Sequence, residues 1–441
     1  MSFLRRLYRR SAPLAVSALV LASALTGCAG PTASAKTRGV TITVADFFPA
    51  PPASTLAQFT ASTGIKVKWT TVDFDSLQTK IATAAVANTY FADITDVDWS
   101  RVGQLARLKW FYPMETLLNA DQLRATMPQL PSFTVGGHLV GVPFDASFLV
   151  TTVNHVLFQR AGITTMPTSI GQYTDDLRKI KAAHVVQYPL DIPFAAAEGL
   201  STYWYHTTAA FGGTVLSTSQ EPLFASPGSA GYQAAQWMVD AIKTGLVPPG
   251  NINVSDTQGQ ATLMAKGQVA SVFGDYSGNV GSLYDVRASS TVPGQVTYIR
   301  TPGVKGNAGN VSNPDGLGIP KLARHPQAAA QFVDWLTRAD NQAGFAGGAG
   351  PSKVLSGYFL PSRAAGVDQL VNKGALSGGR TLSDMLRHSA QPAFPAGPPS
   401  WYPQFSRAVY SNLHAAAAGS MSVPAALNAI ASTARSLEKN A

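Results

Sequence analysis

The segment from residue 40 to residue 99 alternates between strand-like and helix-like patterns. Three short runs are typical of β-strands, Val40–Val44, Ile65–Val72 and Phe91–Thr95. Helical spacing of apolar residues fills the intervals, at about Ser54–Thr63 and Phe74–Ala87. This alternation predicts an α/β fold, in which ligands bind at the carboxyl ends of the strands.

The rest of the sequence predicts further strands, a C-terminal helix and two segments without regular structure. Strands are expected at Gln268–Phe273 and Thr297–Arg300, and the apolar spacing near the C-terminus predicts a helix. Five glycines make Gly303–Gly318 a predicted loop, and Gly397–Tyr402 is predicted to be irregular with exposed aromatic side chains.

Composition indicates a folded protein large enough for two domains. The chain has 441 residues, of which 45% are hydrophobic and 13% are charged, which excludes a disordered chain. The net charge is +9, and the four arginines of the first ten residues contribute four of those charges. Because no dense basic run follows them, nucleic-acid binding is disfavoured.

The N-terminus has the features of a secretory leader. Basic residues precede an apolar run, Ala12–Leu25, that is shorter than the ~20 residues that span a bilayer. Small residues before Cys28, the single cysteine, resemble the lipobox of bacterial lipoproteins. The resemblance implies a signal peptide over residues 1–27, lipidation of Cys28 and a lipid-anchored linker over residues 28–39, outside the cytoplasmic membrane. The alternative is a plain signal peptide with a stray cysteine.

The usual motifs of enzymes are missing from the sequence. There is no G-x-S-x-G, no H-E-x-x-H and no GxxxxGK[ST], and no two of the seven histidines stand four apart. Matches to the motifs of penicillin-binding enzymes, Ser436–Lys439 and Lys243–Gly245, occur in reversed chain order. We therefore expect no enzymatic activity, no cofactor and no metal. A surface-anchored hydrolase is the disfavoured alternative of another class.

Several segments, taken in their order, resemble the extracellular solute-binding proteins of ABC importers, in the sugar-type group that includes maltose-binding protein. The resembling segments are Phe91–Ile94, Asp98–Trp99, Tyr112–Glu115, Gly141–Pro143, Phe158–Ile163, Phe211–Gly213, Gly267–Phe273, Gly316–Ile319 and Leu360–Arg363. Two positions depart from the family pattern, because Ile170 stands near a usual tryptophan and Ala85–Ala87 replaces a frequent glycine.

The resemblance implies two lobes, each a mostly parallel sheet flanked by helices. The implied N-lobe is 40–146 with 310–356, and the implied C-lobe is 147–309 with 357–441. Crossover segments are expected near Asp145–Thr151, Arg300–Asn310 and Leu355–Pro361. A ligand would bind between the lobes, which close by a hinge motion. The closed form of the monomer would then deliver the ligand to a membrane permease.

The candidate ligand-binding residues are acids and aromatics at predicted strand ends and crossovers. Carboxylates accept hydrogen bonds from sugar hydroxyls, and flat rings cover the apolar faces of the sugar. The candidates are Asp46, Phe47, Asp96, Asp98, Trp99, Asp145, Tyr203, Trp204, Asp275, Tyr276, Asp315 and Trp401. Purely structural roles are open for several of them, since Asp98 could cap a helix and Trp99 or Trp204 could be core.

The expected ligand is a di- or oligosaccharide. A glycerophosphodiester or other polyol phosphate is an alternative that would need Arg300 or Arg363 in the cleft. A polyamine, the second alternative, would need more carboxylates than aromatics.

Overall fold

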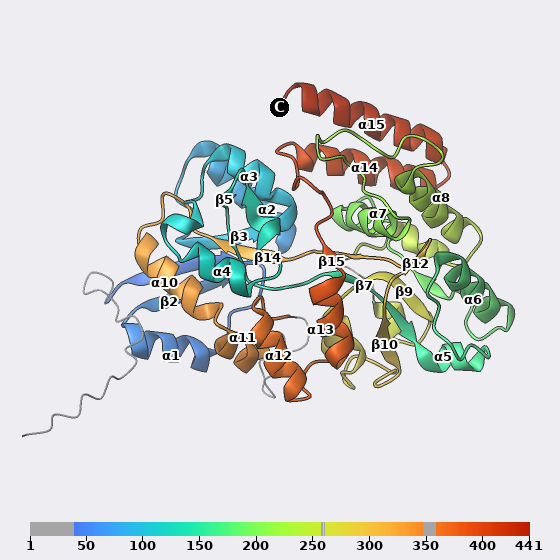
Figure 1. Cartoon of the computed structure of the whole chain (residues 1–441), viewed down its shortest axis with the longest axis horizontal. Helices are drawn as coiled ribbons and strands as arrows, with labels where there is room; N and C mark the ends of the chain where they lie inside the picture. Colours follow the sequence, from blue (N-terminus) through green and yellow to red (C-terminus); the bar gives the residue numbers. More distant parts are fainter. Residues whose placement is uncertain (1–38, 257–258, 260, 347–358) are drawn as a thin grey trace, which may run out of the picture.

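The computed structural model describes residues 39–441, apart from 257–258, 260 and 347–358 (Figure 1). The described residues form two α/β bodies, one around a five-stranded sheet and one around a four-stranded sheet. We refer to these bodies as the N-lobe and the C-lobe. The predicted two-lobed α/β fold is thereby confirmed. The predicted signal peptide and Cys28 lie outside the described residues.

The N-lobe sheet begins with the predicted alternation. Strand β1 (Thr41–Asp46) pairs in parallel with β2 (Lys66–Thr71) and β3 (Ile94–Asp98). Helices α1 (Ala53–Thr63) and α2 (Phe74–Ala87) connect them. Strand β3 begins and ends three residues later than predicted, because every residue of β3 is buried and no alternation marks its bounds.

The remaining N-lobe elements come from two distant parts of the chain. The first part supplies α3 (Val102–Leu108), α4 (Ala120–Thr126), β4 (Thr134–Val135), β5 (His138–Leu139) and β6 (Val142–Pro143). The second part supplies β14 (Asp315–Gly318), α10 (Pro326–Leu336) and α11 (Ala339–Ala346). The sheet order is β2-β1-β3-β14-β6.

The prediction of a loop over Gly303–Gly318 is wrong. This segment contains β11 (Pro302–Gly303), β12 (Gly306–Asn307), β13 (Asn310–Val311) and β14. A Cβ at Gly316 would lie 2.5 Å from the ring of Phe133, and one at Gly318 would lie 2.6 Å from that of Phe111. These glycines therefore allow close packing of a central strand, not a flexible turn.

The C-lobe sheet has the order β10-β7-β9-β8. Its strands are β7 (Leu149–Asn154), β8 (Leu190–Asp191), β9 (Ser271–Tyr276) and β10 (Val296–Ile299). The helices that follow β7 are α5 (His155–Arg160), α6 (Ile170–Ala182), α7 (Glu198–Ala210), α8 (Ala230–Lys243) and α9 (Thr262–Ala265). The C-terminal part of the chain supplies α12 (Ala364–Asn372), which packs against α11 of the N-lobe, and then α13 (Gly379–His388), β15 (Ala390–Gln391), α14 (Tyr402–Ala417) and α15 (Val423–Lys439).

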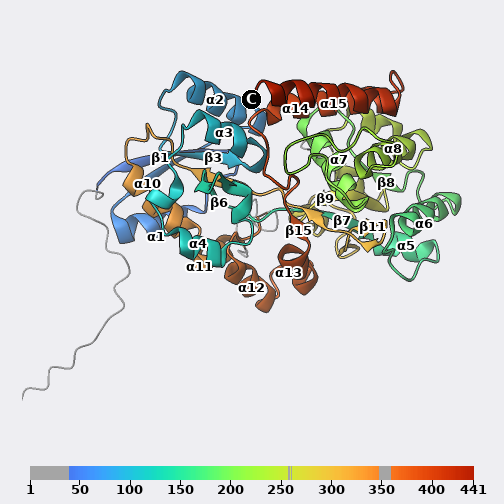
Figure 2. The same ribbon diagram turned by 45° about the horizontal axis from the view of Figure 1, so that its top comes forward.

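Helices α14 and α15 lie side by side along the outer side of the C-lobe, next to α7 and α8 (Figure 2). The prediction of exposed aromatics in Gly397–Tyr402 is wrong, because Trp401 and Tyr402 are both buried. Both rings join the large apolar cluster formed with α7, α8 and α15. The backbone is irregular as far as the start of α14 at Tyr402, as predicted. The residues that predict an irregular backbone do not, however, show whether the aromatic side chains are buried.

Crossing segments run side by side between the lobes. Asp145 forms a bridge with Pro361, and Phe148 forms one with Ser312. Each sheet has one strand that runs opposite to the others, β14 in the N-lobe and β7 in the C-lobe. Both strands directly follow a crossing, so each begins at the edge of its sheet where the other strands end. This is why their direction is reversed. Among the described residues, no helix is both long and apolar enough to cross a bilayer.

Candidate ligand-binding site

A cavity of about 320 Å³ lies between the two lobes, beside the carboxyl ends of β3 and β9. The N-lobe and the crossing after β13 contribute Phe47, Phe74, Asp75, Asp98, Trp99, Ser100, Asn313 and Asp315. The C-lobe contributes Ala197, Glu198, Thr202, Asp256, Ala261, Tyr276, Asn279 and Leu283. Of the twelve predicted residues, the structure brings five together here, namely Phe47, Asp98, Trp99, Tyr276 and Asp315.

Asp98 and Asp315 stand opposite each other on the antiparallel strands β3 and β14. Directly opposed residues project from the same face of a sheet, so the two carboxyl groups are neighbours. Oδ1 of Asp98 accepts a hydrogen bond from the backbone N–H of Ser100 at 2.9 Å. Asp98 therefore caps the short helix that follows and also lines the cavity, so its capping role does not remove it from the cavity wall.

Three further predicted acids lie beside the cavity wall without lining it. Oδ1 of Asp46 accepts from the backbone N–H of Phe48 at 2.8 Å, and Oδ1 of Asp145 accepts from that of Asp315 at 2.7 Å. Oδ2 of Asp96 accepts from Nε2 of Gln78 at 2.5 Å. Each of the three carboxyl groups also has a second, buried oxygen with no hydrogen-bond partner among the described residues.

Burial raises the pKa of every member of this acid cluster, which we define as Asp46, Asp96, Asp98, Asp145 and Asp315. Desolvation raises the pKa of Asp98 to about 6 and those of Asp46 and Asp145 to about 7. The pKa values of Asp96 and Asp315 are raised well above the usual range by desolvation and then by the neighbouring carboxylates. The carboxyl groups of this cluster therefore keep their protons to a higher pH than exposed aspartates do.

Trp99 is both a wall of the cavity and part of the apolar contact between the lobes. Its ring stacks on Phe394 at 6.2 Å between centroids and lies 6.1 Å from the ring of Tyr402. Its Nε1 donates to Oδ1 of Asn313 at 2.9 Å. The ring of Trp99 therefore has both of the roles considered for it, because it packs in the apolar core and also lines the cavity.

Asp275 lies under the C-lobe wall of the cavity. It accepts hydrogen bonds from the hydroxyl groups of Thr152 at 2.6 Å and Tyr284 at 2.8 Å, and from Nδ2 of Asn279 at 2.5 Å. Asn279 itself lines the cavity. Asp275 thus holds a lining residue in place without reaching the cavity.

The other predicted aromatics belong to the C-lobe core. Tyr203, Trp204 and Trp401 are each at most 4% exposed and do not line the cavity. Nε1 of Trp204 donates to the backbone oxygen of Gly231 at 2.9 Å. Trp204 is therefore a residue of the C-lobe core, which was the structural alternative considered for it.

Sequence reasoning missed several lining residues, including Phe74, Glu198, Asp256, Asn279 and Asn313. Phe74 packs edge-on against Phe47, with ring centroids 5.4 Å apart. Glu198 pairs with Arg101 of the N-lobe at 3.4 Å and accepts from the hydroxyl of Ser406 at 2.9 Å. Glu198 lies in the first turn of α7, where the helix dipole favours an acidic side chain, and no sequence pattern marked it as a residue that faces the other lobe.

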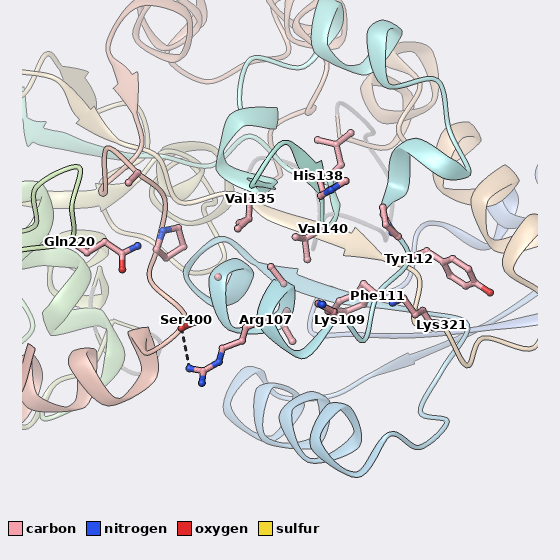
Figure 3. A pocket seen from close by; sticks show the side chains of 17 residues that line it. Arg107, Lys109, Phe111, Tyr112, Val135, His138, Val140, Gln220, Lys321 and Ser400 are labelled. Carbon is pink, nitrogen blue, oxygen red and sulfur yellow. Dashed lines mark hydrogen bonds between the residues drawn. The ribbon is translucent and has the colours of Figure 1, made fainter. Parts of the chain in front are cut away.

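A second cavity, of about 610 Å³, lies beside α3 and the segment that precedes α14 (Figure 3). Its lining includes Arg107, Lys109 and Lys321, and Nη1 of Arg107 donates to the hydroxyl of Ser400 at 3.5 Å. None of the predicted site residues lines it. We centre the site on the smaller cavity because strand ends and paired acids converge there.

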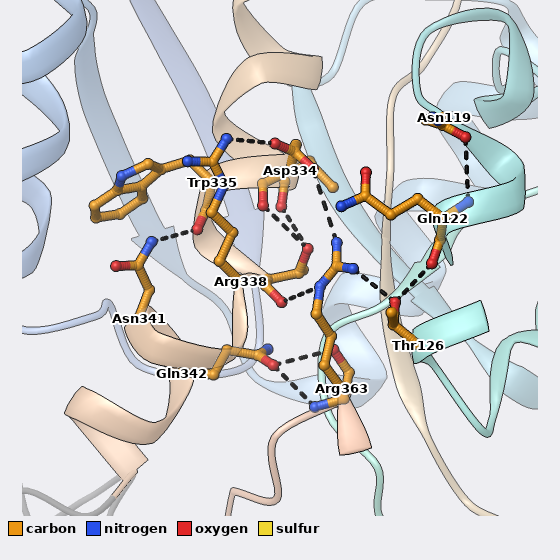
Figure 4. A network of polar contacts seen from close by, with 12 residues as sticks. Asn119, Gln122, Thr126, Asp334, Trp335, Arg338, Asn341, Gln342 and Arg363 are labelled. Carbon is orange, nitrogen blue, oxygen red and sulfur yellow. Dashed lines mark hydrogen bonds and ion pairs between the residues drawn. The ribbon is translucent and has the colours of Figure 1, made fainter. Parts of the chain in front are cut away.

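The arginines that a phosphate ligand would require are placed elsewhere. Arg363 donates to the backbone oxygen of Thr337 at 2.8 Å and to the hydroxyl of Thr126 at 2.7 Å, and lies 3.8 Å from Asp334 (Figure 4). Arg300 is exposed. Neither arginine lines the interlobe cavity. The described residues also contain no group of histidine, cysteine or acidic side chains arranged to hold a metal ion.

The fold is shared with solved sugar- and polyol-bound proteins. The maltose-bound MalE3 of T. maritima is 20% identical, with a TM-score of 0.77 over 90% of this chain and 100% of that chain. An ABC-transporter solute-binding protein of Agrobacterium radiobacter K84, in complex with ribitol, is also 20% identical, with a TM-score of 0.77 over 91% and 99% of the two chains.

Sequence comparison gives the family. A binding protein of Brucella abortus (strain 2308) is 23% identical over 325 residues, which are 71% of this chain and 73% of that protein. The family of bacterial extracellular solute-binding proteins matches residues 43–343, which is more than half of the chain. The protein therefore belongs to the bacterial extracellular solute-binding proteins, a family that acts outside the cytoplasm.

Proposed function

We propose that the protein is the solute-binding component of an ABC importer, and that it binds a carbohydrate or polyol in the interlobe cavity. The observation that carries this proposal is the composition of the cavity wall. Acids that accept hydrogen bonds from hydroxyl groups, Asp98 and Asp315, lie beside the flat rings of Trp99 and Tyr276. The solved relatives with maltose and ribitol support the same ligand class.

The size of the cavity favours a small ligand. Its volume of about 320 Å³ lies at the lower end of the roughly 300–1,000 Å³ typical of ligand sites. We therefore propose a ligand of one or two sugar units, or a polyol of that size, in place of a longer oligosaccharide. Polyol phosphates are disfavoured because acids line this cavity and Arg300 and Arg363 do not.

Three further proposals concern the anchoring, the domain division and the delivery of the ligand. Cys28 would be lipidated, so that the chain is tethered to the cell membrane as a lipoprotein. The domain division would be 40–146 with 310–356 and 147–309 with 357–441. The protein would act as a monomer without catalysing a reaction, and its closed form would contact the transmembrane subunits of a permease.

A ligand screen tests the proposed function. Purified protein lacking residues 1–28 is melted with a panel of neutral sugars, polyols, amino sugars, polyol phosphates and polyamines. A ligand at 100 times its Kd adds ~2.7 kcal/mol to the unfolding free energy, which raises the melting temperature. A panel in which no carbohydrate or polyol raises the melting temperature contradicts the proposal. Generic glycosidase and esterase substrates, incubated with the same protein, test the hydrolase alternative.

A further inference from the structure

Acidic side chains dominate the polar wall of the interlobe cavity. Five acids line it, namely Asp75, Asp98, Glu198, Asp256 and Asp315, and no lysine, arginine or histidine is among the described lining residues. Arg101, whose charge lowers the pKa of Asp98, is already paired with Glu198 at 3.4 Å. The cavity therefore offers a ligand many more acceptors than cations.

Several hydrogen-bond donors in the same wall are already used. Nε1 of Trp99 donates to Asn313, and Nδ2 of Asn279 donates to Asp275. The hydroxyl of Tyr276 donates to Oδ2 of Asp256 at 2.6 Å. A carboxyl group that ionises when a ligand binds can only accept hydrogen bonds, so the ligand itself must then supply much of the donor capacity.

Asp315 is the acid that most clearly awaits a partner. It is 8% exposed, it lines the cavity, and its buried Oδ1 has no hydrogen-bond partner among the described residues. Asp98 stands directly opposite it on the neighbouring strand. A buried carboxylate is costly unless it is paired, and an ammonium group provides both three N–H donors and the opposite charge.

Resting on the proposed function, we propose that the ligand is a carbohydrate or polyol bearing a protonated amine, and that its ammonium group binds between Asp98 and Asp315. The rings of Phe47, Phe74 and Trp99 then cover the C–H face of the ligand. This arrangement separates the amine-bearing end of the ligand, held by the N-lobe acids, from its hydroxyl groups, which reach the C-lobe wall.

Binding of the ammonium group should release protons. The pKa values of Asp98 and Asp315 are raised mainly by burial, and a cation between them lowers both. The charged groups acting on this pair are Asp46, Asp96, Asp145, Arg101 and Glu198. Titration in two buffers of different ionisation enthalpy should therefore show proton release with an amine ligand and much less with its neutral counterpart.

Calorimetric titration of matched ligands tests the inference at neutral pH. The pairs are glucosamine with glucose and N-acetylglucosamine, and 1-amino-1-deoxysorbitol with sorbitol; spermidine provides an amine without a sugar. We expect at least one amine-bearing sugar or polyol to bind tenfold or more tightly than its neutral counterparts.

Isosteric variants locate the effect. Asp315→Asn and Asp98→Asn remove the charge and keep the shape, so each should weaken binding of the amine-bearing ligand more than that of its neutral counterpart and thereby abolish the preference for the amine. Asp175→Asn serves as the control, because its side chain is 75% exposed in a surface pair with Arg178. Melting temperatures of all variants check that they fold.

The outcomes separate the two proposals. Equal or tighter binding of the neutral members overturns the amine inference and leaves carbohydrate binding in place. Binding of spermidine alone, or of no carbohydrate at all, overturns both. An amine preference that survives both Asn variants overturns the assignment to Asp98 and Asp315.

Discussion

At the residue scale, single side chains in this site have two structural roles at once. Trp99 lines the cavity and also packs on Phe394 and Tyr402. Asp98 caps a helical turn and also faces the ligand space. Substitutions here are therefore expected to change ligand binding and stability together.

Trp99→Ala should lower both the ligand affinity and the melting temperature. Removal of a buried aromatic ring costs about 3–5 kcal/mol of unfolding free energy, and the wall of the cavity is lost with it. Trp99→Phe keeps a ring but loses the hydrogen bond to Asn313, so its effect should be smaller. Calorimetry and thermal melts of both variants measure this, and an unchanged melting temperature in Trp99→Ala would contradict the packing described.

The sequence allowed the acids at the ends of β1, β3 and β9 to be predicted, because strand ends are where α/β sheets meet ligands. It did not distinguish Trp99, in the cavity wall, from Trp204, in the core, because both are aromatic residues in apolar surroundings. Glu198 and Asn313 were missed because they meet Arg101 and Trp99 only after the lobes come together. Such pairings depend on tertiary packing that no local pattern encodes.

At the element scale, α3 of the N-lobe rests directly on the segment that leads into α14. A Cβ at Gly103 would lie 2.0 Å from the backbone oxygen of Pro398. The same helix carries Arg107, which contacts Ser400. Close approach of these two elements therefore requires a glycine at position 103.

Gly103→Ala should hinder the close contact between the lobes and weaken ligand binding by about tenfold or more. The clash is with backbone, so a side-chain rotation cannot relieve it, whereas a small opening of the lobes can. Gly171→Ala is the matched control, because Gly171 is also helical and a Cβ there meets nothing within 4 Å. Equal affinities of the two variants, measured by calorimetry, would show that α3 tolerates the added methyl group.

The contact between Arg101 and Glu198 also joins the lobes. Glu198→Gln removes the charge that pairs with Arg101 and should shift the empty protein toward more open conformations, because the remaining hydrogen bonds are neutral. Small-angle scattering should record a larger radius of gyration than in the wild type. The same radius in both proteins would exclude a role for this pair in lobe closure.

At the scale of the whole molecule, a basic chain encloses an acidic site. The net charge is +9, yet the acid cluster contains five buried aspartates. Their folded-state pKa values are raised above the value of 3.8 that applies to an unfolded aspartate. The folded protein thus binds more protons than the unfolded chain over the intervening pH range.

The unfolding free energy should therefore fall as the pH rises from about 5 to about 8, since this stabilisation is complete below the unfolded pKa and is lost through the folded pKa values. Asp46→Asn and Asp145→Asn keep the acceptor oxygens used by Phe48 and Asp315 and should flatten the dependence. Thermal melts across this range measure it. A melting temperature that rises with pH would contradict the assignment of raised pKa values.

The most direct test of the whole account is a crystal structure of the protein with the tightest ligand from the screen. We predict electron density for one carbohydrate or polyol between the lobes, in contact with Asp98, Trp99, Tyr276 and Asp315. Density only in the cavity lined by Arg107, Lys109 and Lys321 would contradict the placement of the site.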